Sequence, residues 1–342
     1  MKKAAIYNPY LDTMGGGERY TLAVVQALTK ADYKVFVEWK NKDILKKLED
    51  RFGVDLKDTQ VLPDVKRGDG YDVCFWVSDG SIPLLRARKN WLHFQVPFQK
   101  VGGKTLINKM KFFRIAKVIC NSQFTKKFID REYGVNSVVV YPPADIKKFK
   151  PKKKENIILY VGRFSSLKQA KGQEHLVEVF KKVYDQGHDN WKLFLAGGTE
   201  VGSGDLVNML RKSAKGYPIS IIESPDFSSL QTIYGSAKIF WSASGYGIEE
   251  VNNPELVEHF GITTVEAMAA KAVPITYGAG GQIEIVDDGI NGYLWKTKAG
   301  LMDKTIKLIN DNKLLQKMGK KAQEKSRLYS YERFYQEINS LL

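Results

Sequence analysis

The sequence alternates short β-branched or aromatic runs with amphipathic segments of helical length, and this alternation restricts the fold more than any other feature. Runs of this kind occur near 3–7, 34–38, 72–77, 91–95, 117–120 and 137–140, and again near 157–161, 192–196, 218–222, 238–241 and 273–276. Strands separated by helices form a mainly parallel sheet with helices on both faces. The pattern therefore predicts an α/β fold with two Rossmann-like, doubly wound parallel sheets.

The length of 342 residues favours the same division, because one hydrophobic core rarely serves more than about 250–300 residues. We expect an N-terminal domain over residues 1–150 and a C-terminal domain over 151–328, joined by a linker that contains Pro142-Pro143. Residues 329–342 have apolar side chains at helical spacing, and this helix is able to pack back on the N-terminal domain. Two such domains facing each other make a cleft, so function is expected in the strand-to-helix loops.

Positive charge is concentrated in the first half of the chain. The 53 Lys and Arg residues against 38 Asp and Glu give a net charge of +15. Residues 1–150 hold 28 basic and 16 acidic side chains (+12), whereas residues 151–342 hold 25 and 22 (+3). Between Asp79 and Asp130 there are eleven bases and no acid. One face of the N-terminal half should therefore be strongly positive and suited to an anionic partner.

Other classes of protein are disfavoured by the sequence. We find no signal peptide, because the chain enters a strand-like run at residues 4–7, and no apolar run approaches the roughly 18–20 residues of a membrane span. Cys74 and Cys120 lack metal-ligand or redox spacing, so buried thiols in a cytoplasmic protein are expected. The bases occur without a helix-turn-helix, zinc-finger or RNA-binding motif, so nucleic acid is not expected as a partner.

The first candidate site is the loop that contains Gly15, Gly16 and Gly17, between the first predicted strand and a helical segment. Adjacent glycines let the backbone approach a ligand closely, and the following helix start offers N–H groups suited to phosphate. The spacing matches neither GxGxxG nor a P-loop. From these residues alone, a plain flexible turn is the alternative.

The second candidate site begins at Arg163, which follows the first strand of the C-terminal half in the sequence VGRF. An arginine at a strand end and a lysine at the next helix start supply two fixed cations that can hold a diphosphate. Lys168 and Lys171 are both candidates, and Lys171 is favoured because Lys171-Gly172 directly precedes the helical run. Ordinary solvated charges are the alternative.

The third candidate site is the sequence EHFGITTVEAMAAK, which starts at Glu258. Glu258 lies in a predicted loop, Gly261 and Thr263 lie where a helix opens, and Glu266 lies one to two turns into that helix. A loop carboxylate beside the N–H groups of a helix start can bind phosphate and sugar hydroxyls together. The predicted loop and helix start around them carry this interpretation, because two glutamates eight residues apart mean little by themselves.

In this order and spacing, the motifs resemble the landmarks of the family 4 retaining glycosyltransferases of the GT-B fold. The landmarks are GGGER, VGRF with a downstream Lys-Gly, EHFGITTVEAMAA, VPI, GGQIEIV and DDGINGYLW. The resemblance spans residues 5–295. It implies transfer of a sugar from a nucleotide diphosphate donor to an acceptor hydroxyl, with retention of the anomeric configuration.

The resemblance also implies roles for the donor-side residues. Arg163 and Lys171 would neutralise the departing diphosphate, and Glu266 would bind the donor ribose. Glu258 would hold the hydroxyls of the transferred sugar. The backbone N–H groups that would assist it belong to Phe260, Gly261 and Ile262, with Thr263 next to them at the helix start.

Two further roles fall in the N-terminal half. The Gly15–Gly17 loop would reach toward the donor phosphate and the acceptor, and His93, in NWLHFQVPF, would lie beside the sugar. Without the resemblance, a structural role is the more common one for a lone histidine. Some relatives carry a histidine near Ser242, and this chain does not, which leaves that part of the sugar pocket undefined.

No cofactor is expected apart from the donor. The chain contains no Asp-x-Asp, so a divalent metal that bridges the diphosphate is not predicted. The donor base is not readable, and GDP-, UDP- and ADP-sugars are all candidates. The GGGER and EHFGITTVEAMA details look most like mannosyltransferases that use GDP-mannose on lipid-linked glycans.

Residues 100–117 carry six bases interleaved with apolar side chains. Such a segment can lie on an anionic membrane, which would make the protein peripheral to the inner face of the membrane. An ordinary surface helix is the alternative. For the whole chain, the alternative functions are a sugar-nucleotide epimerase of similar two-domain fold and a basic nucleic-acid-binding protein.

Overall fold

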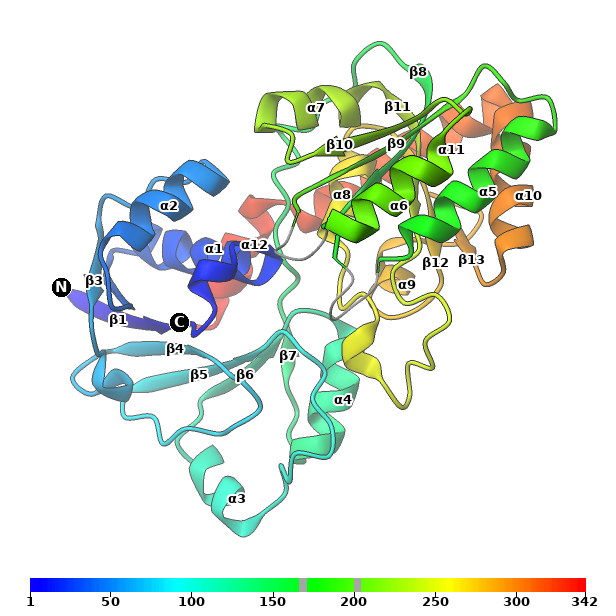
Figure 1. Ribbon diagram of the computed structural model, residues 1–342. Coiled ribbons are helices and arrows are strands. Elements are labelled where there is room, and N and C mark those ends of the chain that lie inside the picture. The colour runs from blue at the N-terminus through cyan, green and yellow to red at the C-terminus, as the bar shows by residue number, and fades with distance from the viewer. Residues whose placement is uncertain (166–170, 200–203) are drawn as a thin grey trace. The chain divides into compact units, whose positions relative to one another are not determined.

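The protein is described by a computed structural model that covers residues 1–165, 171–199 and 204–342 (Figure 1). The chain divides into two compact units. Unit 1 comprises Met1–Pro143 and Tyr331–Leu342, and unit 2 comprises Ala144–Ser330. The division therefore falls at Pro143 and at Ser330, whereas the sequence suggested residues 150 and 328.

Unit 1 is built on one seven-stranded sheet in the order β3-β2-β1-β4-β5-β6-β7, and all its strand pairs are parallel. The strands are β1 (Lys2–Tyr7), β2 (Tyr33–Glu38), β3 (Thr59–Leu62), β4 (Val73–Val77), β5 (Lys89–Phe94), β6 (Lys117–Cys120) and β7 (Val138–Val139). The helices are α1 (Gly16–Lys30), α2 (Asp43–Phe52), α3 (Leu106–Phe112), α4 (Gln123–Tyr133) and α12 (Tyr331–Ser340). The predicted strands are present, and β3 is an additional one at the sheet edge.

The last helix of the chain, α12, packs against the first, α1, within unit 1. Phe334 and Ile338 are fully buried on it, and the Phe334 ring meets Tyr20 edge-on at 5.2 Å between ring centroids. Arg333 donates a hydrogen bond of 2.7 Å to the backbone oxygen of Tyr141. The apolar stripe of the C-terminal segment thus completes the core of unit 1.

Unit 2 is built on a six-stranded parallel sheet in the order β10-β9-β8-β11-β12-β13. The strands are β8 (Glu155–Val161), β9 (Lys192–Gly197), β10 (Ile219–Glu223), β11 (Ala237–Ser242), β12 (Val273–Tyr277) and β13 (Tyr293–Trp295). The helices are α5 (Gln173–Asp185), α6 (Gly204–Ala214), α7 (Phe227–Ser236), α8 (Ile262–Ala269), α9 (Gln282–Ile285), α10 (Lys298–Asn310) and α11 (Asn312–Ser326). The α/β prediction is confirmed in both units.

The predicted linker contains the boundary between the units, and its part after Pro143 packs on unit 2. Phe149 is buried in the core of unit 2, and its ring meets Tyr234 edge-on at 4.9 Å between ring centroids. The ammonium group of Lys154 donates hydrogen bonds of 2.6 Å to the backbone oxygens of Ala237 and Ala270. Burial, with a further contribution from nearby Lys271, lowers the pKa of Lys154 to about 7. The proline and lysine content of the segment gave no indication that Phe149 and Lys154 would be anchored in this way.

Candidate active site

The clearest cluster of predicted residues lies at the carboxyl edge of the unit 2 sheet. Lys171 lies two residues before α5, whereas Glu258 lies in the loop before α8, 87 residues further along the chain. Lys171 Nζ lies 3.0 Å from Glu258 Oε2. The side chains are only 12% and 24% exposed, so this ion pair is partly shielded from water. The fold has brought together two residues that the sequence had placed in separate motifs.

The start of α5 is fixed by a glycine and a buried glutamine. Gly172 has φ of 67°, and a Cβ there would lie 2.9 Å from the Cβ of Ala243 in the loop after β11. Only glycine combines that backbone conformation with so close an approach. The side chain of Gln173 donates a hydrogen bond of 2.9 Å to the backbone oxygen of Arg163. The loop that carries the exposed Arg163 is therefore tied to the helix that Lys171 precedes.

The electrostatic environment keeps Glu258 ionised. Burial alone would raise the pKa of its carboxyl group, but the Lys171 ammonium, with smaller contributions from His259 and the Ser244 hydroxyl, holds the pKa below its ordinary value. At neutral pH, this edge of the sheet therefore presents a carboxylate and an ammonium side by side. Such a pair can accept hydrogen bonds from hydroxyl groups and attract phosphate oxygens.

Two glycines after β12 clasp the loop that carries Glu258. The N–H of Gly281 donates a 2.8 Å hydrogen bond to the backbone oxygen of Glu258. A Cβ on Gly280 would lie 2.1 Å from that same oxygen, and a Cβ on Gly281 would lie 2.4 Å from the backbone oxygen of His259. These two glycines belong to a sequence landmark, but their role as backing for the Glu258 loop was not predicted.

The start of α8 supplies the N–H groups that the sequence predicted. Gly261 caps the helix with φ of 109°, and the side chain of Thr264 is buried and donates a 3.0 Å hydrogen bond to Gln282. The first N–H groups of a helix have no partner within the helix, and they carry a partial positive charge. Ile262 and Thr263 lie in this first turn, and Phe260 is buried directly before it.

Glu266 lies deeper than the other predicted residues. It is 5% exposed, and the buried hydroxyl of Tyr234 donates a hydrogen bond of 3.0 Å to its Oε2. The carboxylate is therefore held by α7 and lies behind the helix start. Tyr234 was not identified from the sequence, because nothing in the pattern of α7 distinguishes it from an ordinary core tyrosine.

The glycine loop of unit 1 has a defined shape. Both the N–H of Gly15 and the hydroxyl of Thr13 donate hydrogen bonds of 2.7 Å to the carboxylate of Glu18. A Cβ on Gly17 would lie 2.2 Å from the side-chain oxygen of Gln95, whereas a Cβ on Gly16 would meet nothing within 4 Å. Gly15 is the N-cap of α1, and Gly16 and Gly17 lie in its first turn, so the predicted loop is the start of this helix, packed against the residue that follows β5.

His93, for which the resemblance implied a place beside the sugar, is fully buried in unit 1. Its ring stacks on Tyr20 at 4.2 Å and on Phe75 at 5.3 Å between ring centroids, and its Nδ1 lies 3.2 Å from the backbone oxygen of Ile119. Burial lowers the pKa of His93 to about 3, although the hydrogen bond to Ile119 opposes that shift. His93 therefore lies on β5 among aromatic neighbours within unit 1.

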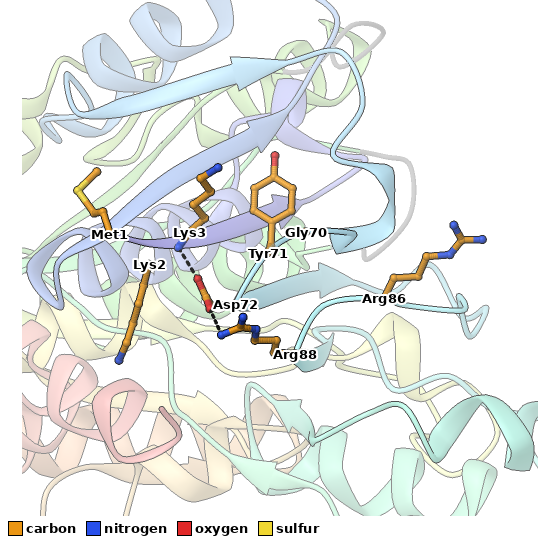
Figure 2. Close-up of a pocket in the computed structure, with 8 residues that line it drawn as sticks. All are labelled: Met1, Lys2, Lys3, Gly70, Tyr71, Asp72, Arg86 and Arg88. Atoms are coloured by element: carbon orange, nitrogen blue, oxygen red, sulfur yellow. Dashed lines mark hydrogen bonds and ion pairs between the residues drawn. The ribbon is translucent and has the colours of Figure 1, made fainter.

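A separate hollow of about 570 Å³ lies at the amino ends of the unit 1 strands, at the opposite edge of that sheet from the glycine loop. Figure 2 shows Asp72 between the backbone N–H of Lys3, at 2.8 Å, and the guanidinium group of Arg88, at 3.2 Å. The hollow is lined by none of the predicted site residues. Its lining consists of Met1, Lys2, Lys3, Gly70, Tyr71, Asp72, Arg86 and Arg88. Arg88 is 84% exposed there, so this is an open surface hollow.

The remaining predictions concern a lysine, metals and the membrane. Lys168, the alternative to Lys171, lies outside the described residues. Within residues 1–165, 171–199 and 204–342, no three His, Cys, Asp or Glu side chains gather in a way that could hold a metal ion. In the same ranges, every helix is too short or too polar to cross a bilayer.

Comparison with solved structures confirms the fold. The crystal structure of Anabaena HepE in complex with UDP and glucose superposes with a TM-score of 0.74 at 17% identity, covering 99% of both chains. The protein has two Rossmann-like parallel-sheet domains, which is the GT-B architecture. An identity this low shows the fold alone.

Sequence relatives point in the same direction. A glycosyltransferase of Methanocaldococcus jannaschii is 27% identical over 67% of this chain and 61% of its own length, so the match leaves over a third of that relative unaligned. A GDP-Man:Man(3)GlcNAc(2)-PP-Dol alpha-1,2-mannosyltransferase of Caenorhabditis elegans is 22% identical over 91% of this chain and 84% of its own length. The family model for glycosyl transferases group 1 matches residues 143–325. Because that match covers more than half of the chain, the protein belongs to the glycosyl transferases group 1 family.

Proposed function

We propose that this glycosyltransferase moves a sugar from a nucleotide diphosphate donor to an acceptor hydroxyl with retention of the anomeric configuration. The observation that carries the proposal is the Lys171–Glu258 ion pair of 3.0 Å beside the start of α8. It sets a cation, a carboxylate and helix N–H groups at one edge of the sheet. A nucleotide diphosphate sugar needs those three kinds of partner, for its phosphates and its hydroxyls.

The cations stabilise the charge that develops as the donor bond breaks. When the glycosyl–phosphate bond breaks, positive charge grows on the sugar and negative charge on the diphosphate. Arg163 and Lys171 neutralise the departing diphosphate, assisted by the positive end of α8. The Gly15–Gly17 loop binds the phosphates from unit 1. In this proposal the reaction needs no metal ion, because the two cations take the place of one.

The sugar is held by the carboxylate side of the site. Glu258 accepts hydrogen bonds from the sugar hydroxyls. The N–H groups of Phe260, Gly261 and Ile262 donate hydrogen bonds to the sugar, with Thr263 beside them. Glu266, held by Tyr234, binds the ribose of the donor nucleotide. The clasp of Gly280 and Gly281 on the Glu258 loop supports these roles, since it fixes the geometry before the donor arrives.

In the chemical step, the acceptor oxygen forms a bond to the anomeric carbon on the same face from which the diphosphate leaves. The bond between the anomeric carbon and the phosphate oxygen breaks, and its electron pair goes to the diphosphate. The proton of the acceptor hydroxyl passes to an oxygen of the leaving phosphate. No group of the protein becomes covalently attached to the sugar, so retention follows from attack and departure on one face.

For the substrates, we propose mannose from GDP-mannose and a lipid-linked or cell-envelope glycan. The C. elegans relative supports this choice, because its name specifies GDP-Man and a PP-Dol glycan. The concentration of positive charge in residues 1–150 suits an acceptor that carries a pyrophosphate or lies at an anionic surface.

A donor screen followed by a transfer assay tests the proposal. Thermal unfolding is measured with GDP-mannose, UDP-glucose and ADP-glucose, because a ligand that binds the folded state raises its stability. GDP-mannose should give the largest shift, and NMR of the product should show the anomeric configuration of the donor. A larger shift with UDP-glucose would replace the donor, inverted product would overturn the same-face step, and activity that is lost with EDTA and restored by Mg²⁺ would overturn the role of the cation pair.

A further inference from the structure

Helix α3 exposes apolar side chains that the fold leaves uncovered. Leu106 is 74% exposed, Phe113 is 91% exposed, and Ile107 and Met110 are exposed to a similar degree. No residue of α3 is buried. Scattered exposed apolar residues are normal, but here they lie within eight consecutive residues at the outer margin of unit 1 (Figure 1). We call residues 100–114 the α3 platform.

The platform is held in place by α4. The carboxylate of Glu132 accepts hydrogen bonds from the backbone N–H groups of Lys100, Val101 and Gly103, at 2.9, 3.0 and 3.1 Å. A Cβ on Gly103 would lie 2.7 Å from the backbone oxygen of Glu132, so the loop is pressed directly onto α4. The hydroxyl of Thr105 caps α3 by accepting a hydrogen bond from the N–H of Asn108. The apolar side chains are therefore presented by an anchored element.

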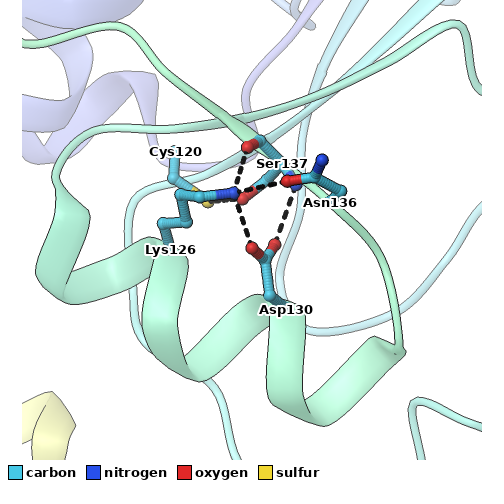
Figure 3. Close-up of polar contacts among 5 residues, drawn as sticks. All are labelled: Cys120, Lys126, Asp130, Asn136 and Ser137. Carbon is cyan, nitrogen blue, oxygen red and sulfur yellow. Dashed lines mark hydrogen bonds and ion pairs between the residues drawn. The ribbon is translucent and has the colours of Figure 1, made fainter.

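The platform also carries more positive than negative charge. Lys100, Lys104, Lys109 and Arg114 are exposed on it. The next acid after the platform in the sequence is Asp130, and its contacts lie elsewhere. It forms an ion pair of 2.6 Å with Lys126 and accepts a hydrogen bond of 2.8 Å from the N–H of Ser137 (Figure 3). Glu132, the next acid, accepts hydrogen bonds from three N–H groups of the platform loop, and its single negative charge is outnumbered by the four exposed bases.

We propose that the α3 platform inserts into the surface of an anionic lipid bilayer. Leu106, Ile107, Met110 and Phe113 enter the boundary between headgroups and acyl chains, while the lysines and Arg114 contact lipid phosphates. Burial of apolar side chains and attraction of basic ones add together at such an interface. A nucleic acid would use only the charges, since exposed aliphatic side chains gain little on a phosphate backbone. This inference does not depend on the donor or on the reaction.

Vesicle flotation tests the proposal with two matched sets of substitutions. The full chain is mixed with neutral phosphatidylcholine vesicles or with vesicles that also contain phosphatidylglycerol. In the platform variant, Leu106, Ile107, Met110 and Phe113 are changed to Ser, and every charge is kept. In the control variant, four apolar residues of unit 2 with 50–60% exposure are changed to Ser, namely Val251, Ile283, Ile290 and Leu328.

The platform variant should bind anionic vesicles at least about tenfold more weakly than the control variant and the wild type. Equal flotation of the two variants would overturn the proposal, and so would a wild type that does not float with anionic lipid. If instead the protein binds duplex RNA, ignores vesicles and loses nothing in the platform variant, the basic face serves nucleic acid and the lipid proposal is wrong.

A fluorescent label separates insertion from loose adsorption. Cys74 and Cys120 are both fully buried, so a cysteine introduced by Phe113→Cys can be labelled selectively with an environment-sensitive dye. Anionic vesicles should shift its emission to shorter wavelength and raise its intensity. The matched label at Leu328→Cys should not respond. Equal responses at the two positions, or none at residue 113, would contradict insertion of the platform.

Discussion

The Lys171 ammonium lies 3.0 Å from the Glu258 carboxylate and joins the loop before α5 to the loop before α8. Burial alone would raise the pKa of Glu258, so the lowered pKa depends on this lysine. A partly shielded pair is asymmetric in energy, because removing one partner leaves the other charge without compensation. A change at Lys171 should therefore alter both the protonation of Glu258 and the proposed reaction.

Lys171→Met should slow sugar transfer by about 100-fold, which is the usual cost of removing one group that stabilises a developing anion. It should also raise the pKa of Glu258, because burial is then no longer opposed by the ammonium. The acid limb of the kcat/KM profile should therefore move to higher pH. Lys171→Arg, which keeps the charge, should restore the position of that limb. An unchanged acid limb in Lys171→Met would show that Glu258 is not the titrating group.

Gly280→Ala should be much more damaging than Gly289→Ala. Both glycines have positive φ, 58° and 78°, so both substitutions cost about 1 kcal/mol of backbone strain. A Cβ on Gly280 would in addition lie 2.1 Å from the backbone oxygen of Glu258, whereas a Cβ on Gly289 meets nothing within 4 Å. Transfer activity and the melting temperature should fall for Gly280→Ala and change little for Gly289→Ala. Similar losses in both variants would mean that the clasp is unimportant.

Strand and helix periodicity was sufficient to predict both sheets, except for one edge strand in each. The missed strands, β3 and β13, are the outermost strands of their sheets and only four and three residues long. An edge strand pairs on one side only, so it needs less of the continuous apolar pattern that identifies a central strand. The boundary between the units falls at Pro143, inside the predicted linker, but the anchoring of the basic segment after it by one buried aromatic residue, Phe149, was not predictable from its composition.

Residues of the candidate site were predictable where a motif follows the end of a strand or precedes the start of a helix. Arg163, Lys171, Glu258 and Gly261 were identified in this way, because parallel strands bring their carboxyl ends to one edge. The pairing of Lys171 with Glu258 was not predictable, since it depends on how two loops approach each other in space. The burial of His93 was missed because its neighbours Tyr20 and Phe75 are distant in the sequence.

Tyr234→Phe should weaken donor binding without changing kcat much. The Tyr234 hydroxyl donates a hydrogen bond of 3.0 Å to the buried carboxylate of Glu266. Removing the hydroxyl leaves that carboxylate with one donor fewer. We expect a higher KM for the donor and about 1–3 kcal/mol lower stability. Tyr217→Phe is the matched control, because it removes a surface hydrogen bond of 3.1 Å to Asp185. If donor KM is the same in both variants, Tyr234 is not a positioning residue for Glu266.

His93→Phe should make the protein less sensitive to acid. The pKa of His93 is about 3 in the folded protein and near 6.5 when unfolded, so below pH 6.5 the unfolded state binds a proton that the native state does not. The wild type should therefore lose about 2 kcal/mol of stability from this residue between pH 7 and pH 5, as measured by urea unfolding, whereas His93→Phe keeps the stacked ring and avoids that loss. His188→Phe, which changes a histidine outside the core, should lose stability as the wild type does. An equal loss in His93→Phe would show that the ring is protonated in the folded state, and hence that it reaches water.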